Sequence, residues 1–414
     1  MRPIFLLLLP LLIGCTHVQN KENKSANADS QNGLVTFHLN APPSKVEPLL
    51  LSELADSVSY VALETTKETL TDKAIQYGDR YYTIAKDQRL ICFDKSGKYL
   101  HQIGRRGKGP EEYTWMEYYD DFTVDSETNW VYCKSYDKRT QVYDENGKFV
   151  KSLTGGLWDY RPEFVYNHFV CFTQTCHPIV EVLDERNNQC VTNNKEKTEE
   201  IRRFWDAVIE KCQKEGKKES YTEGGWPVTS ISNNALYRWS VFFDTVMMAK
   251  GKEVKPFCRI IPENKYLPED TYSSNRKPWL LQPIIRRMYV CNDKILLYIR
   301  YYPSIQERTH YWALCDLKDG SVTYHSDYII NDLDGGPNIL GPNADDEEIY
   351  SLSVEDLKND EEIYNSYFTP GVEAKLKDQE GKFQRLFEPL ADDANPIIRT
   401  IHWKEYNSDS MSDS

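Results

Sequence analysis

The chain has 414 residues, a formal net charge of −14 at pH 7 and 28 tyrosines. This acidity argues against binding to a nucleic-acid backbone and against adhesion to anionic lipid headgroups by charge alone. The abundance of aromatic residues suits β-strands, which favour aromatic and β-branched side chains.

The N-terminus predicts an exported lipoprotein. Arg2 precedes an apolar run over residues 4–13, which is shorter than the roughly 20 residues that span a bilayer and has the length of a signal-peptide core. Residues 12–15 read Leu-Ile-Gly-Cys and resemble the lipobox of bacterial lipoproteins. The resemblance implies cleavage before Cys15 and attachment of acyl chains such as palmitate, which would anchor the chain to a membrane. The alternative is an ordinary signal peptide in which Cys15 is incidental.

The domain organisation follows from composition. Residues 1–15 form the signal peptide, and residues 16–45 read as a flexible tether, because residues 19–33 contain no aromatic or large aliphatic side chain. Residues 46–405 are expected to form one large β domain, and residues 406–414 a disordered acidic tail.

A copied segment with a period of 50 residues is the main evidence for the fold. Residues 80–103 and 130–153 align without a gap, and Gly97 matches Gly147. Each copy reads as strand, polar turn, strand, glycine turn and strand, and the glycine supplies the positive φ of a tight hairpin. A further strand over residues 122–125 precedes the second copy. Four short antiparallel strands per period are typical of a β-propeller blade.

Later segments repeat this theme with altered turns, at residues 163–184, 230–261, 290–299 and 311–322. Dividing the chain by about 50–60 residues per blade predicts an all-β propeller of six blades, with seven as the alternative. Two β-sandwich domains are the weaker interpretation, because they leave the repeat unexplained. The strand at residues 397–403 is expected to share a blade with the strand near residues 60–63, which would close the ring without an exposed edge.

Two segments have helical rather than strand spacing. The first is a helical insertion at residues 196–220, whose apolar face is formed by Ile201, Phe204, Trp205, Val208, Ile209 and Cys212. We expect it to cap one face of the propeller, with docking of a partner as the alternative. The second is a short C-terminal helix over residues 372–390, which Gly381 weakens.

The cysteines do not form a disulfide pattern. Nine remain after Cys15, an odd number, and they are scattered through apolar runs without a C-x-x-C pair. We therefore expect most of them to be small buried hydrophobic residues and at least one thiol to be free.

Four stretches carry a resemblance to a known family, namely residues 58–66, residues 93–100 with 103–113, residues 331–337 and residues 395–396. On these residues the chain resembles the six-bladed β-propeller lipoproteins of Gram-negative gut anaerobes, which are similar in form to NHL-repeat and TolB-like propellers. The family's usual loop has Gly at the position of Glu111. The resemblance implies the fold and an outer-membrane lipoprotein. Residues 16–19 are not acidic, unlike the surface-export signal of some related lipoproteins, which favours the periplasmic face over the cell surface.

Three groups of residues are candidates for binding. The glycine-rich loop 104–113 carries Arg105 and Arg106, which suggest an anion site, although no helix N-terminus follows and an inter-blade connection is the favoured interpretation. His177 is a candidate pocket residue, but it cannot pair directly with Cys176, because adjacent residues of a strand face opposite sides. The acidic residues at 332, 334 and 345–348 lack EF-hand spacing and read as solvated loops.

The absence of a catalytic motif favours binding over catalysis. We therefore expect a membrane-anchored propeller that binds a protein, peptide or glycan in the cell envelope, with no nucleic-acid partner and no cofactor. The alternative is a metal-dependent hydrolase or lyase, with a Ca²⁺ or Zn²⁺ ion held in the central channel by carboxylate, Asn or His side chains from several blades.

Overall fold

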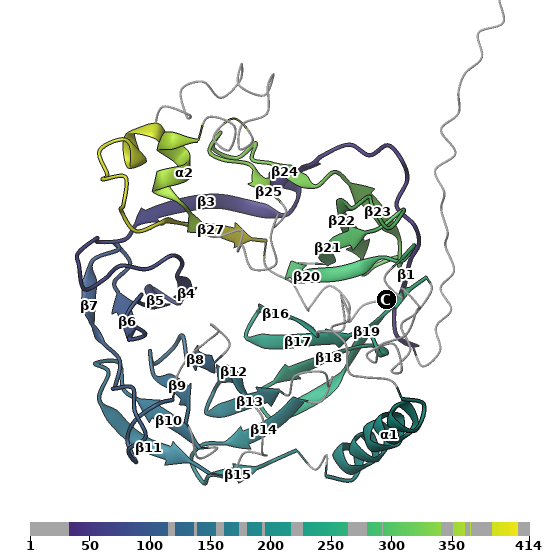
Figure 1. The fold of residues 1–414 in the computed structure, drawn as a ribbon, viewed down its shortest axis with the longest axis horizontal. Coiled ribbons are helices and arrows are strands. Elements are labelled where there is room, and N and C mark those ends of the chain that lie inside the picture. The colour runs from purple at the N-terminus through teal and green to yellow at the C-terminus, as the bar shows by residue number, and fades with distance from the viewer. Residues whose placement is uncertain are drawn as a thin grey trace, which may run out of the picture.

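A computed structural model describes residues 33–114, 121–135, 139–154, 161–173, 180–192, 195–216, 227–263, 280–291, 293–340, 351–360, 365 and 383–404. These residues form an all-β propeller of six blades around a central axis (Figure 1). The predicted fold is therefore confirmed, with six rather than seven blades.

Five blades are built from antiparallel strands in chain order. Blade 1 contains β4 (Ile75–Tyr77), β5 (Arg80–Ile84), β6 (Leu90–Phe93) and β7 (Tyr99–Gln102). Blade 2 contains β8 (Phe122–Val124), β9 (Val131–Lys134), β10 (Thr140–Tyr143) and β11 (Phe149–Leu153). Blade 3 contains β12 (Arg161–Tyr166), β13 (Phe169–Thr173), β14 (Val180–Asp184) and β15 (Gln189–Cys190). Blade 4 contains β16 (Val228–Ser232), β17 (Ala235–Ser240), β18 (Phe243–Lys250) and β19 (Glu253–Pro262), and blade 5 contains β20 (Ile284–Cys291), β21 (Lys294–Tyr301), β22 (Thr309–Asp316) and β23 (Val322–His325).

The sixth blade closes the ring with strands from both ends of the chain. It contains β3 (Ala55–Ala62), β27 (Ile397–Trp403) and β26 (Ser351–Leu352). The strands β3 and β27 pair antiparallel, with Ile397 opposite Ala62 and Arg399 opposite Tyr60. The predicted pairing of the terminal strands is thus confirmed. Because this pairing joins the ends of the ring, no terminal blade is left with an open edge at this position.

The internal repeat folds as predicted, and its two glycines have the same role. Gly97 and Gly147 have φ of 82° and 75° and lie in the turns before β7 and β11. A Cβ atom on Gly97 would overlap the carbonyl oxygen of Ala62 in the preceding blade. The carbonyl oxygen of Gly97 also accepts a hydrogen bond from the Glu64 N–H at 2.7 Å, and that of Gly147 from the Gly104 N–H at 2.8 Å. Each outer turn therefore ties its blade to the one before it.

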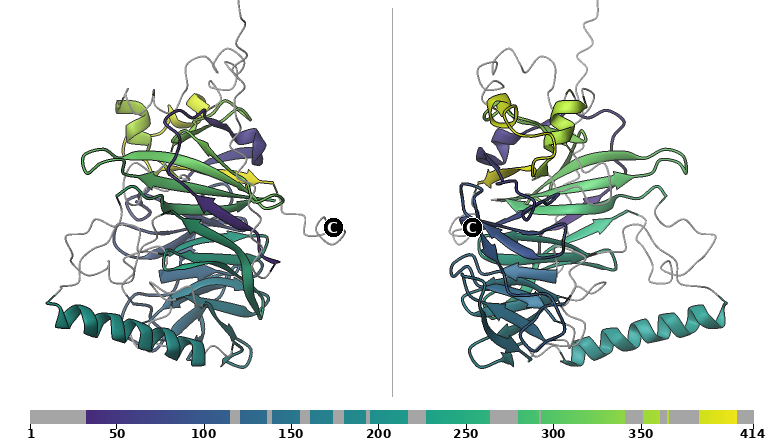
Figure 2. Two further views of the ribbon diagram at one scale, coloured as in Figure 1. Left: turned by 90° about the vertical axis from the view of Figure 1, so that its right-hand side faces the viewer. Right: turned by 60° about the vertical axis from the view of Figure 1, so that its left-hand side comes forward.

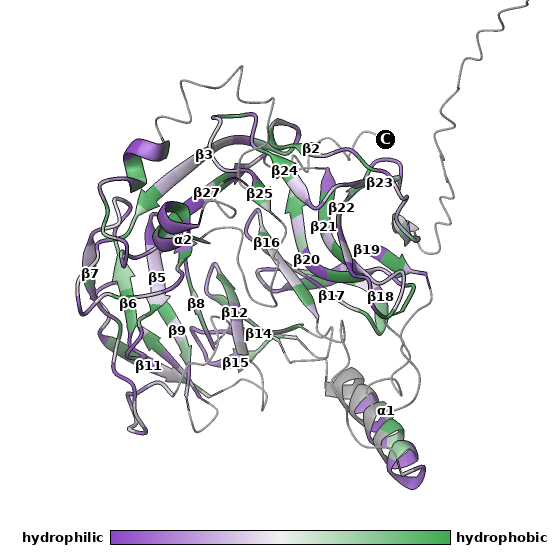
Figure 3. Ribbon diagram, turned by 45° about the horizontal axis from the view of Figure 1, so that its top comes forward, coloured by the Kyte–Doolittle hydropathy of each residue, from purple (hydrophilic) through white to green (hydrophobic). Residues whose placement is uncertain are grey.

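The core consists of apolar clusters between neighbouring sheets, and Figure 3 shows apolar residues along the strands of the blades. A small sheet of β2 (Leu49–Leu50), β24 (Tyr328–Ile330) and β25 (Ile339–Leu340) packs in one cluster with blade 5 and with Ile401 of blade 6. A 3-10 turn, η2 (Leu51–Glu53), follows β2. Cysteines at 92, 133, 171, 212, 258, 291 and 315 are buried and free, as expected, whereas Cys190 is exposed.

The predicted tether ends earlier than expected. Residues 36–39, assigned above to the tether, form β1 (Thr36–Leu39), which pairs in parallel with β19 as a fifth strand of blade 4. Phe37 and Leu39 are fully buried there. Residues 36–39 alternate in polarity as a strand does, but the polar residues before them led to their assignment to the tether.

The helical insertion is present, but its predicted position is wrong. Helix α1 (Lys195–Lys214) connects blades 3 and 4. Figures 1 and 2 show it at the outer rim and projecting from the ring, instead of lying across a face of the propeller. Val208 and Cys212 are buried, whereas Phe204 is exposed. Among the residues of the predicted apolar face whose burial is described, Val208 and Cys212 are therefore the two that are buried.

The C-terminal helix is confirmed in part. Residues 383–387 are helical, and Phe383 and Phe387 are buried against Tyr60 and Ile397, while residues 372–382 lie outside the described part of the chain. A short helix that the sequence analysis did not predict, α2 (Val354–Asn359), is capped by the Ser353 side chain. No helix among the described residues is long and apolar enough to cross a membrane.

Candidate functional site

Two of the predicted site residues, Cys15 and His177, lie outside the described residues, as do Cys176 and residues 345–348. The other two, Arg105 and Arg106, lie in the connection between blades 1 and 2. Asp332 and Asp334 have structural contacts. The Asp332 carboxylate accepts hydrogen bonds from the Ser52 N–H and hydroxyl, and Asp334 accepts from Asn331 and from the Gly336 N–H.

The glycine-rich loop binds a carboxylate of its own. The Glu112 carboxylate accepts hydrogen bonds from the Gly109 N–H at 2.8 Å and from Arg105 Nε at 3.0 Å. These contacts, with the Gly109 N–H the strongest, hold the pKa of Glu112 below its usual value. A Cβ atom on Gly107 would overlap this carboxylate, and one on Gly109 would be in tight contact with it. The loop amide that an external anion would use is therefore already bonded, which favours the inter-blade interpretation over the anion site.

Blade 2 holds this loop in place. The Tyr143 hydroxyl donates to the carbonyl oxygen of Glu111 at 2.8 Å, and Gln141 Nε2 donates to that of Pro110 at 2.8 Å. Glu111 is not among the described residues with positive φ, so the residue that replaces the family's usual Gly fits the loop without strain.

On the inner strand of blade 3, the carboxylate of Glu163 is already paired. Glu163 lies on the inner strand β12, and its carboxylate accepts a hydrogen bond from Arg238 Nη1 of blade 4 at 3.0 Å. The Thr173 hydroxyl also donates to it. No group of three or more His, Cys, Asp or Glu side chains that could hold a metal ion occurs among the residues with a described position.

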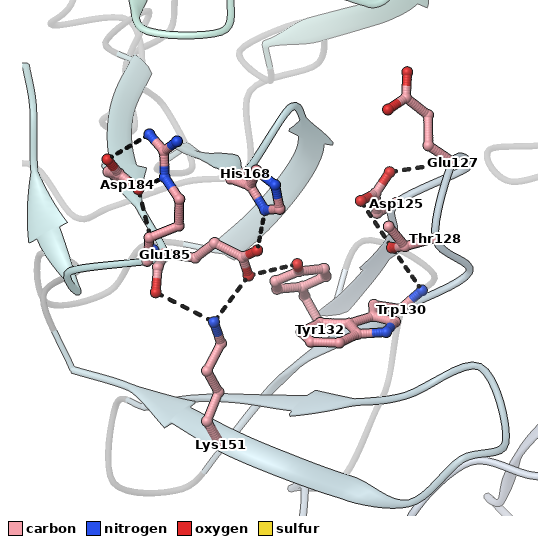
Figure 4. A network of polar contacts seen from close by, with 10 residues as sticks. Asp125, Glu127, Thr128, Trp130, Tyr132, Lys151, His168, Asp184 and Glu185 are labelled. Carbon is pink, nitrogen blue, oxygen red and sulfur yellow. Dashed lines mark hydrogen bonds and ion pairs between the residues drawn. The ribbon is translucent and has the colours of Figure 1, made fainter.

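The most complete polar cluster lies between blades 2 and 3 (Figure 4). At its centre is Glu185, which directly follows β14 and has a side chain only 4% exposed. Its carboxylate accepts a hydrogen bond from the Tyr132 hydroxyl at 2.6 Å and contacts His168 Nδ1 at 2.9 Å and Lys151 Nζ at 3.4 Å. The carbonyl oxygen of Glu185 also accepts from Lys151 Nζ at 3.2 Å. We call Tyr132, Lys151, His168 and Glu185 the Glu185 cluster.

Local backbone geometry positions each member of the Glu185 cluster. Tyr132 and Lys151 both face Val142 across the antiparallel pairs of blade 2, so they lie in one row on one face of the sheet. His168 follows Asn167 in the two-residue turn between β12 and β13, and both have positive φ, 66° and 48°. This is the geometry of a type I′ hairpin turn. It brings His168 O within 3.0 Å of the Glu185 N–H.

The electrostatics of the Glu185 cluster follow from its burial. Desolvation, followed by the bond to Glu185, raises the pKa of Tyr132 well above its usual value, so the hydroxyl stays a donor. Lys151 lies 5.7 Å from the ring centre of Trp130, a cation–π contact. Beside the cluster, Arg186 binds Asp184 through two hydrogen bonds and holds the pKa of Asp184 below its usual value. The arrangement surrounds the buried Glu185 carboxylate with Tyr132, Lys151 and His168, of which the His168 side chain is about half-exposed.

The sequence analysis missed the Glu185 cluster because its members are far apart along the chain. Tyr132 and Glu185 are separated by 53 positions. A usable signal was the Asp-Glu pair after the third strand in two blades, at residues 144–145 and 184–185.

Comparison with known proteins places the chain in a structural context. A family model described as "Domain of unknown function (DUF4934)" matches residues 34–402. No curated protein matches the chain. Among solved structures, a Bacteroides fragilis protein designated as exported is similar with 14% identity and a TM-score of 0.50, over 90% of this chain and 99% of that one. PorZ, a surface component of the type-IX secretion system of Porphyromonas gingivalis, is similar with 8% identity and a TM-score of 0.31, over 68% of this chain and 38% of that one.

Proposed function

The chain belongs to the DUF4934 family. We propose that it is an exported, lipid-anchored β-propeller that binds a protein, peptide or glycan in the cell envelope. The anchor is Cys15, and the proposed location is the outer membrane, on its periplasmic face. The proposal includes no cofactor and no nucleic-acid partner.

Two lines of support concern location. The N-terminal sequence ends an apolar run at a lipobox-like Cys15. The Bacteroides fragilis protein with the same fold, which this chain matches over almost its full length, is designated as exported. Twelve or more polar residues between Cys15 and β1 would give a tether of tens of ångströms, at about 3.3 Å per extended residue.

The observation that supports the binding role is a pair of exposed apolar side chains in the connections of blade 5. Leu281 and Ile305 are 47% and 58% exposed, and they lie in the connections at one end of blade 5. The Leu281 N–H donates to the carbonyl oxygen of Tyr302 at 3.0 Å, which ties the two connections together. Connecting loops on a scaffold of strands commonly carry the residues that bind a partner.

The lipid anchor is tested by labelling cells with a palmitate analogue. We expect the natural chain to be labelled and recovered with outer membranes, and Cys15→Ser to be unlabelled and released. Protease treatment of intact cells then distinguishes the two faces, because a periplasmic chain is protected.

The binding role is tested by cross-linking the full chain to its partners in isolated cell envelopes. A double variant that carries both Leu281→Ser and Ile305→Ser is compared with the control variant Leu100→Ser. Leu100 is similarly exposed, at 40%, but lies on the outer strand β7. A partner lost only with the blade 5 variant supports the proposal. Cross-links that both variants retain equally would contradict this surface.

A further inference from the structure

The junction between blades 1 and 2 repeats the layout of the Glu185 cluster one period earlier. In blade 1, Tyr82 faces Cys92, and Cys92 faces His101, which places these three in one row across β5, β6 and β7. The corresponding row of blade 2 is Tyr132, Val142 and Lys151. Each member of the first row lies 50 positions before its counterpart.

At both junctions a cationic side chain donates to a backbone carbonyl of the next blade, although Lys151 belongs to the row of blade 2 whereas Arg80 lies two residues before Tyr82, outside the row of blade 1. At the second junction, the Lys151 ammonium donates to the carbonyl oxygen of Glu185. At the first junction, Arg80 Nη1 donates to the carbonyl oxygen of Glu145 at 2.6 Å. Glu145 and Glu185 hold equivalent places, because each follows an aspartate at the end of the third strand: Asp144 comes directly after β10, and Asp184 is the last residue of β14. The two junctions therefore present a Tyr hydroxyl and cationic side chains toward the same turn.

The junctions differ in where the carboxylate lies. The Glu185 carboxylate is buried against Tyr132, Lys151 and His168. The Glu145 side chain instead accepts a hydrogen bond from the neighbouring Asn146 amide at 3.2 Å, in an exposed turn.

The donors of the first junction have no anion partner. The Tyr82 hydroxyl and His101 Nε2 are buried and make no hydrogen bond of ordinary geometry, and the polar groups that act on the hydroxyl are Cys92 and Arg80. Arg80, whose charge acts on both of them, has no carboxylate contact among the residues with described positions. Asp144 acts on His101 electrostatically, but its Oδ1 is bonded to the N–H groups of its own turn.

Such an arrangement is costly unless an anion binds. A buried hydroxyl without a hydrogen-bond partner lowers the stability of the folded state, and buried polar atoms of this kind call for a specific explanation. Burial, followed by the positive charge of Arg80, lowers the pKa of His101. A bound carboxylate would supply acceptors to the hydroxyl and the guanidinium and would offset that positive charge. Arg80 and His101 are partly exposed, and the fully buried Tyr82 side chain lies beside them in the same blade.

We propose that Arg80, Tyr82 and His101 form a binding site for the carboxylate of a small ligand, at the junction of blades 1 and 2. The Glu185 carboxylate shows, within the same chain, how the site is filled. This site is separate from the blade 5 surface and does not depend on the lipid anchor.

The test titrates the full mature chain with acetate, glucuronate and glutamate and follows binding by calorimetry and by the NMR signal of the His101 ring. We expect saturable binding that raises the pKa of His101. Loss of a hydrogen bond to a charged group corresponds to roughly 10–100-fold in affinity, so Arg80→Gln and Tyr82→Phe should each weaken binding by about tenfold or more. The matched control Tyr132→Phe should leave the affinity unchanged. Preference for glucuronate would indicate a sugar acid, and preference for glutamate a peptide carboxylate.

Two results would overturn the proposal. One is that the natural chain and Tyr82→Phe bind the carboxylate probes with the same affinity, or that neither binds them. Tyr82→Phe retains the aromatic ring and should fold even if Arg80→Gln does not. The other is a crystal structure without a carboxylate probe in which the Glu145 side chain contacts Tyr82 and His101. In that case the chain fills its own site.

Discussion

The two equivalent tyrosines should respond in opposite ways to loss of their hydroxyl groups. Tyr132→Phe removes a 2.6 Å hydrogen bond to a carboxylate, and both residues are nearly inaccessible to water, so solvent cannot replace the donor. Hydrogen bonds to charged groups contribute about 1.5–3 kcal/mol, and we expect a loss of about 2 kcal/mol. Tyr82→Phe removes a buried hydroxyl without a partner and should leave stability unchanged or raise it by up to about 1 kcal/mol.

The measurement is urea unfolding of both variants in a buffer without carboxylates. A lower midpoint for Tyr132→Phe at an unchanged slope would show that native stability changed and not the denatured state. A double-mutant cycle with Glu185→Gln assigns the effect to the pair, because the coupling disappears if the hydroxyl and the carboxylate do not interact. Equal losses for the two tyrosine variants would refute the reasoning.

Three further results are expected. Gly97→Ala should destabilise the chain by more than Gly216→Ala in thermal unfolding, because both have positive φ but only Gly97 would meet a backbone oxygen, that of Ala62; equal effects would mean that φ alone matters. Arg186→Gln should raise the pKa of Asp184 in an NMR titration. Because the pKa of Asp184 is lowered in the folded state, its ionised carboxylate stabilises the fold above the unfolded-state pKa near 3.9, and this stabilisation is lost as the pH falls through the folded-state pKa. A titration curve of Asp184 that does not shift in Arg186→Gln would contradict this. EDTA should not change the thermal midpoint, whereas a fall reversed by Ca²⁺ or Zn²⁺ would favour the channel-metal alternative.

Local signals in the sequence were enough to predict the blades. Alternation of apolar residues depends only on the period of a strand, and the turn at Gly97 depends on backbone sterics within a few residues. The closing pair of β3 and β27 was predictable because a ring with free ends would expose strand edges. By contrast, β1 pairs with β19 in blade 4, and although residues 36–39 alternate in polarity, nothing in that short pattern indicates which strand they pair with.

The dependence on contacts between distant segments also explains why the blades around the Glu185 cluster could be predicted but the cluster itself could not. The repeat shows that Tyr82 and Tyr132 hold equivalent places within their own blades, but their hydroxyl groups point toward the following blade. What they meet there depends on a turn whose sequence differs between copies, with Lys95, Glu145 and Glu185 at the equivalent position.

The strands repeat from blade to blade, whereas the residue after the third strand varies, and this difference affects how binding sites can evolve in this fold. Because the strands and outer turns hold each blade to its neighbour, the residue after the third strand can change without loss of the ring. The Glu185 side chain is buried and forms an ion pair with Lys151 of the preceding blade. The Glu145 side chain instead lies in an exposed turn, so Tyr82 and His101 of the preceding blade can bind another carboxylate. One prediction separates these roles. Glu185→Gln should lower stability but leave acetate binding intact, and Glu145→Gln should leave both nearly unchanged. A loss of acetate binding in Glu145→Gln would mean that this side chain belongs to the site after all.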